Sequence, residues 1–151
     1  MPTSLRACAT LLARNGIRHH LDVADAAIRL VFVTRDYENP RGEKLAIVRL
    51  ETPDAGLRLR ASITRAFPVH SDPAATCLAL CRLAAESPLV GVEYDAVGRD
   101  IRLVVETIVE DSRLTKRQLF ATVDGLVAAA EAWHVALRAA RRRAGRVRDA
   151  A

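Results

Sequence analysis

The order of its hydropathy patterns constrains this chain of 151 residues more than any single motif does. One helical pattern comes first, and three strand-like runs follow it. An apolar helix, two further strand-like runs and a long helix complete the chain. Consecutive strands are usually joined as antiparallel hairpins, and helices must bury one face on a sheet or on each other. The order therefore predicts a single α+β domain in which three helices cover five mostly antiparallel strands.

The boundaries of these elements follow from periodicity and from turn residues. Apolar residues three and four positions apart indicate helices, whereas β-branched or alternating runs indicate strands. The segment 18–27 is ambiguous, and it is either a connector or the beginning of a strand. The predicted helices cover 5–15, 74–86 and 116–137, and the predicted strands cover 28–34, 44–51, 57–64, 90–95 and 101–106.

The last two strands allow a register to be predicted, because antiparallel partners must point to the same face of the sheet. That condition requires an even number of loop residues, and 96–99 is the natural loop, with Gly98 at positive φ. The expected pairs are Val90 with Val105, Val92 with Leu103, Tyr94 with Ile101 and Glu93 with Arg102.

The second predicted helix is unusually apolar. Asp72 is its expected N-cap and Pro73 its first residue, and from 74 to 86 only Thr76, Arg82 and Glu86 are polar. Such a helix is expected to be covered on most sides, by the sheet on one side and by another helix or a second subunit on the other. We therefore expect a homodimer. The expected interface residues are Cys77, Leu78, Leu80, Cys81 and Leu83.

The net charge of +5 is concentrated at the C-terminal end. The last fourteen residues contain six arginines and one aspartate, so the remainder of the chain is neutral. The apolar stripe of the last helix, which begins at Leu119, ends at Leu137. We therefore predict a domain of residues 1–137 and a separate Arg-rich helical extension or tail of residues 138–151.

From about Leu45 to Leu137 the chain resembles the YbjN-like family, whose fold is shared with type III secretion chaperones. The resemblance is carried by the strand 57–63 leading into Phe67-Pro68-Val69, the apolar helix 73–85, the hairpin 92–106 and the final helix capped by Thr115. It implies a small α+β domain, often dimeric, without a catalytic centre. In the chaperone branch it also implies binding of extended client segments. Those chaperones are typically acidic, unlike this chain.

The sequence contains no catalytic or cofactor signature. Cys77 and Cys81, with His70 or the pair His19-His20, could be proposed as zinc ligands, but their four-residue spacing is also that of buried thiols in a helix core. The triplet 70–72 (His-Ser-Asp) is better explained as a turn followed by a helix cap than as a hydrolase site. We expect no enzymatic activity, cofactor or metal.

The remaining candidate functional residues are arginines. Those on the sheet belong either to a solvated face of mixed charge or to a surface for an extended protein segment. Those at the C-terminus form a solubilising tail, or they bind an acidic protein or the phosphates of nucleic acid. The candidate partner-binding residues are Arg58, Arg60, Arg102, Arg138, Arg141, Arg142 and Arg143.

These observations predict a cytoplasmic, non-enzymatic protein-binding module, acting as a chaperone or regulatory adaptor. The alternative is a nucleic-acid-associated protein that acts through its C-terminal arginines. No secretory signal begins the sequence, and no run reaches the roughly 18 uncharged apolar residues of a membrane span. We therefore expect no association with a membrane.

Overall fold

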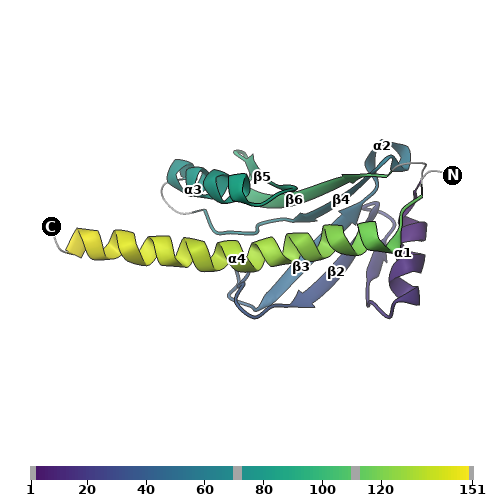
Figure 1. Ribbon diagram of the computed structural model, residues 1–151, viewed down its shortest axis with the longest axis horizontal. Helices are drawn as coiled ribbons and strands as arrows, with labels where there is room; N and C mark the ends of the chain where they lie inside the picture. The colour runs from purple at the N-terminus through teal and green to yellow at the C-terminus, as the bar shows by residue number, and fades with distance from the viewer. Residues whose placement is uncertain (1–2, 70–72, 110–112, 150–151) are drawn as a thin grey trace.

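The computed structural model describes residues 3–69, 73–109 and 113–149, and Figure 1 shows their arrangement. The helices in these residues are α1 (Leu5–Arg14), α2 (Pro53–Gly56), α3 (Pro73–Glu86) and α4 (Lys116–Asp149). The strands are β1 (His20–Asp22), β2 (Ala27–Val33), β3 (Leu45–Glu51), β4 (Arg58–Ile63), β5 (Val90–Asp95) and β6 (Asp100–Ile108). All neighbouring strands are antiparallel, in the order β1-β2-β3-β4-β6-β5. The predicted single α+β domain is thus confirmed.

Helices α1 and α4 pack on the same face of the sheet, and α4 runs along its length (Figure 1). Alternation along the strands separates the two faces. In β2, Ile28 and Leu30 are buried under the helices, whereas Arg29 and Val31 are exposed on the other face. Cys8 and Leu12 of α1 join the same core. The opposite face of the sheet has no helix of the described residues over it.

The sheet has six strands, so the expected number of five is wrong. The additional strand, β1, falls in the segment 18–27 that was ambiguous in the sequence. Its three residues pair with the start of β2, where Leu21 lies opposite Ile28. Ala26, with a φ of 47°, closes the turn between the two strands. Three residues are too few to show an alternating hydropathy pattern. The extended conformation of β1 comes from its pairing with β2.

The predicted register of the β5–β6 hairpin is confirmed pair by pair, from Val90 opposite Val105 to Tyr94 opposite Ile101. The loop also has the predicted four residues. The positive φ, however, belongs to Arg99 (50°) and not to Gly98. Asp95 explains the difference, because its Oδ1 accepts hydrogen bonds from the backbone N–H groups of Val97 (2.9 Å) and Gly98 (3.2 Å). This side-chain turn fixes the first part of the loop and leaves Arg99 to close it.

Helix α4 begins with the predicted capping box. The Thr115 hydroxyl accepts a hydrogen bond from the Gln118 N–H at 3.1 Å, and the Gln118 side chain accepts one from the Thr115 N–H at 3.0 Å. By length and composition alone the helix could cross a membrane. The core helix of a soluble protein can have the same length and composition. Its apolar stripe, from Leu119 through Trp133 to Leu137, is buried against the sheet, which is the arrangement of a core helix in a soluble domain.

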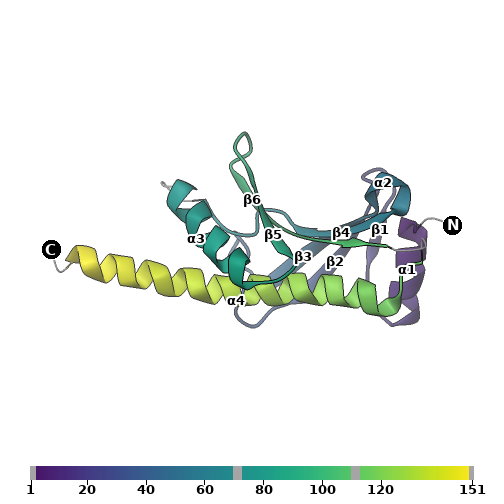
Figure 2. The ribbon, with the colours of Figure 1, turned by 45° about the horizontal axis from the view of Figure 1, so that its top comes forward.

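The backbone of α4 remains helical to Asp149, and its C-terminal part extends beyond the sheet and beyond α3 (Figures 1 and 2). The basic segment is therefore continuous with the last core helix. Within this helix Leu137 is buried, whereas residues 138–143 are exposed.

Candidate protein-binding surfaces

The first candidate surface is the uncovered face of the sheet, which carries a network of ion pairs. The guanidinium group of Arg60 donates to Glu93 at 2.7 Å and to Glu106 at 2.7 Å. Arg58 donates to the same Glu106 carboxylate at 2.9 Å and also pairs with Asp54. Partial burial alone would lower the pKa of Arg60, but the hydrogen bonds to the two glutamates raise it. Both arginines are therefore held in position by acids of β5, β6 and α2.

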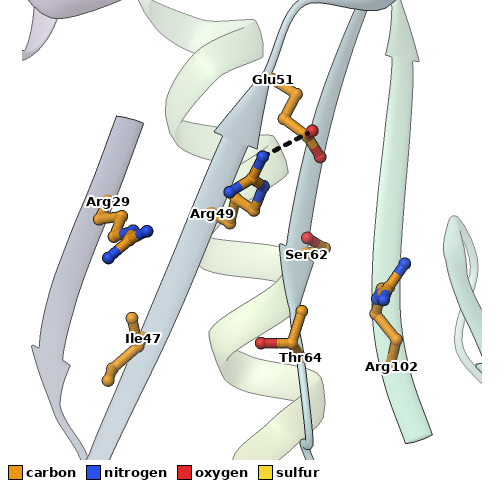
Figure 3. Close-up of a pocket in the computed structure, with 7 residues that line it drawn as sticks. All are labelled: Arg29, Ile47, Arg49, Glu51, Ser62, Thr64 and Arg102. Carbon is orange, nitrogen blue, oxygen red and sulfur yellow. Dashed lines mark hydrogen bonds and ion pairs between the residues drawn. The ribbon is translucent and has the colours of Figure 1, made fainter. Parts of the chain in front are cut away.

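The other half of this face continues the network around a concavity of about 520 Å³. Arg49 contacts Glu51 at 3.2 Å and Asp25 at 3.4 Å, and Arg29 contacts the same Asp25 at 2.8 Å. Figure 3 shows Arg29 and Arg49 on one side of the concavity and Arg102 on the other. Three arginines and one glutamate line the concavity, and Arg29 and Arg49 are paired with acids, as expected of a solvated face of mixed charge.

Arg102 is the least constrained arginine of this face. Its Nη1 lies 3.6 Å from Glu93, and its Nε is buried without a hydrogen-bond partner among the described residues. The structure thus brings the predicted residues Arg58, Arg60 and Arg102 together on one face. The pairing of Glu93 with Arg102 was predicted from the sequence. The acidic neighbours of Arg58 and Arg60 were not.

The second candidate surface is helix α3, which the chain covers much less than its composition predicted. Leu80 is its one buried residue among those described, and it packs toward β5 and α4. Leu78 is 55% exposed and Cys81 is exposed, while Cys77 and Leu83 are partly buried. Leu89, just after the helix, is 79% exposed. Of the five expected interface residues, Leu80 therefore faces the domain core, and Leu78 and Cys81 face away from it.

The exposure of α3 corrects the interpretation of Cys77 and Cys81 as buried thiols. Cys8 is fully buried, and burial raises the pKa of its thiol to about 11. Cys81 is exposed, because α3 touches the rest of the chain along a narrow line. No cluster of metal-binding side chains occurs in the described ranges, and the expected cap Asp72 and the triplet 70–72 lie outside them.

The third candidate surface is the basic end of α4. Arg138 lies 3.5 Å from Glu38, and its side chain is half exposed. The exposed Arg141, Arg142 and Arg143 form no ion pair with any described residue. Arg141, Arg142 and Arg143 thus differ from Arg58 and Arg60 of the sheet, whose guanidinium groups are already paired with carboxylates.

Beside these arginines lies a groove of about 350 Å³, the α4 groove. Partial burial lowers the pKa of His134 in this groove. The nearby Arg138 and Arg141 lower it further, although Glu38 raises it. Sequence reasoning did not find the groove because its walls come from three separate segments. Its main lining residues are Pro40, Phe67, Pro68, Leu137, Arg138 and Arg141.

The fold is similar to that of two solved proteins. Over 91% of this chain and 93% of the other, it resembles the crystal structure of YbjN, a proposed transcription regulator from E. coli, with a TM-score of 0.63 and 12% identity. It also resembles a chain of the HopA1–SchA chaperone–effector complex, with a TM-score of 0.55, 16% identity and coverage of 83% and 88%. The chain has the YbjN-like and secretion-chaperone-like fold.

At these identities the similarity concerns the fold alone. The sequence itself matches no protein-family model and no curated protein.

Proposed function

We propose that this protein is a non-enzymatic, cytoplasmic protein-binding module that forms a homodimer through helix α3 and holds a protein partner as a chaperone or regulatory adaptor. The observation that carries this proposal is the uncovered apolar side of α3. A helix with so few polar residues is unusual at a solvent-exposed position, and contiguous exposed apolar surface typically marks a protein contact.

The two solved proteins support this choice at the level of fold. One is described as a regulator and the other as a chaperone in complex with an effector, and neither description is that of an enzyme. Fold similarity does not transfer a partner, so the proposal rests on the surface of α3 and takes from the fold only the kind of function that such a domain performs.

Burial at α3 offers enough free energy for a specific contact. Removing a large aliphatic side chain such as Leu78 from water is worth about 1.5–3 kcal/mol. In a symmetric dimer each such residue is buried twice, once from each subunit. Leu89 lies directly after the helix and extends the same kind of surface. The edge strand β5, which packs beside α3, adds unpaired backbone groups to it.

Sedimentation equilibrium over micromolar concentrations tests the dimer. We expect the native chain to have twice its mass of 16.5 kDa. The substitution Leu78→Arg should convert it to a monomer with unchanged circular dichroism. The matched control is Val23→Arg, which places the same charge at an even more exposed valine in the β1–β2 turn and should leave the dimer intact. A native chain that sediments as a monomer throughout would refute this part of the proposal.

A role in binding nucleic acid is the second candidate, favoured by the unpaired Arg141, Arg142 and Arg143. Contacts of this kind would be to phosphates and would weaken steeply with salt. Electrophoretic mobility shift with random duplex DNA distinguishes the two functions. Binding that disappears when residues 138–151 are removed would support the second candidate, and absence of binding at low salt would exclude it.

A further inference from the structure

The α4 groove is preformed, because a network of hydrogen bonds fixes the loop that forms one of its walls. The Glu131 carboxylate of α4 accepts hydrogen bonds from three consecutive backbone N–H groups at the start of this loop, those of Arg35 (2.7 Å), Asp36 (2.6 Å) and Tyr37 (2.6 Å). Partial burial would raise the pKa of Glu131, but these three donors lower it. The loop is therefore attached to the helix by a charged group rather than by loose packing.

Further along the same loop, Asn39 organises the part that reaches the groove. Its Oδ1 accepts hydrogen bonds from the N–H groups of Arg41 (2.9 Å) and Glu43 (3.0 Å). Tyr37 of this loop also contacts the opposite wall: its buried hydroxyl donates to the carbonyl of Ala66 at 2.8 Å, and its ring meets the ring of Phe67 edge-on. A partner would therefore bind without the entropic cost of ordering these segments.

The floor and the rim of the groove differ in chemistry. Phe67 and Leu137 form an apolar floor, and Pro68 adds apolar surface at the rim. Arg138 and Arg141 stand along one side. Their positive charge is offset in the groove by Glu38 alone, whose contact with Arg138 is long at 3.5 Å. An incoming carboxylate can therefore pair with Arg141 directly and can compete with Glu38 for Arg138.

We propose that the α4 groove binds an acidic segment of a protein partner, with an apolar side chain against Phe67 and Leu137 and carboxylates on Arg138 and Arg141. This inference rests on the proposed protein-binding function and names the chemistry of the partner. Nucleic acid fits the groove less well. A protein segment can place an apolar side chain on the floor of the groove beside its carboxylates, whereas the phosphate backbone of a nucleic acid has no apolar group to place there.

Fluorescence anisotropy with the full-length protein tests the proposal. The probes are a short fluorescein-labelled peptide of alternating leucine and glutamate, and the same peptide with glutamine in place of glutamate. The acidic peptide should bind the native chain, and the glutamine peptide should bind it at least about tenfold more weakly. The double variant R138E/R141E should reduce the affinity for the acidic peptide about tenfold or more.

The matched control is R142E/R143E, which makes the same change of charge at the next exposed arginines, neither of which lines the groove. It should retain most of the affinity. In addition, Glu38→Gln should strengthen binding a few-fold, because it releases Arg138. Each variant changes exposed or partly exposed side chains, and circular dichroism checks that it folds.

Three results would overturn the groove proposal: no binding of the acidic peptide to the native chain, equal losses in the two double variants, or duplex DNA that displaces the peptide and depends on the same two arginines. Dimerisation is tested independently of peptide binding, because sedimentation of R138E/R141E is measured without any peptide.

Discussion

The arginines of the sheet and those near the end of α4 have the same side chain but differ in whether acidic residues are paired with it. On the sheet, Arg58 and Arg60 share the carboxylate of Glu106 across neighbouring strands. On α4, Arg141 and its two successors have no acidic partner among the described residues. The first group stabilises the sheet and can bind another molecule only if its ion pairs are broken. The second group keeps its charge available for another molecule. The number of arginines in a sequence therefore says little until their acidic neighbours are known.

The largest effect on stability is expected at Glu131, whose carboxylate is satisfied by backbone donors rather than by an arginine. Replacing it with alanine removes the acceptor of three backbone N–H groups, two of them in partly buried hydrogen bonds, and we expect a loss of about 2–3 kcal/mol in the free energy of unfolding. Urea denaturation at neutral pH measures this loss. A cost below that of breaking the arginine pairs would show that the attachment of the loop to α4 is unimportant.

The same residue predicts a pH dependence. The pKa of Glu131 is lowered in the folded state from its ordinary value of 4.5. The stabilisation is therefore complete above that value and is lost as the pH falls through the lower folded pKa. Urea denaturation of native protein and E131Q on lowering the pH from neutral should give curves that converge in acid. Parallel curves would contradict the assignment.

A smaller effect is expected at the sheet network. Glu106→Ala removes the acid shared by Arg58 and Arg60 and should cost about 1 kcal/mol, because these side chains are only partly buried. Glu86→Ala, at the exposed end of α3, is the matched control and should be nearly neutral. The difference between the two variants should shrink in high salt, as expected for screened charges. A difference that is insensitive to salt would mean that packing rather than charge is responsible.

The smallest effect on stability is expected from the unpaired arginines. Replacing Arg141, Arg142 and Arg143 together by glutamine should change the free energy of unfolding by less than about 0.5 kcal/mol, since no described contact is lost. Thermal denaturation checks this. A clear destabilisation would show that the end of α4 is held to the domain, and the contrast between the two groups of arginines would disappear.

Sequence patterns predicted the parts of this molecule that depend on local periodicity. The register of the β5–β6 hairpin and the capping box at Thr115 are confirmed residue by residue, because each is set by spacing within a few positions. The sequence does not decide strand β1, because its three residues take their conformation from β2. The sequence predicts the positive φ at Gly98 because glycine tolerates it best, whereas the turn made by the Asp95 side chain leaves it to Arg99.

The candidate sites were harder to predict, since they depend on contacts between distant segments. The sequence identified Arg60 as a candidate but could not place Glu93 and Glu106 beside it. It identified α3 as apolar but could not tell that Leu80 alone would be buried and that Cys81 would be exposed. The α4 groove combines the loop after β2, the residues after β4 and the end of α4, and no local pattern brings these three together.

Because α4 is continuous, its C-terminal end extends well beyond the buried residue Leu137. The helix goes on for twelve residues after Leu137, which at about 1.5 Å per residue is an arm of about 18 Å. In a dimer formed through α3 there would be two such arms, each with its own groove. A partner with two acidic segments, spaced to match, would then be captured bivalently. Once the first segment is bound, the second meets a high local concentration, so that two weak sites act as one tight one.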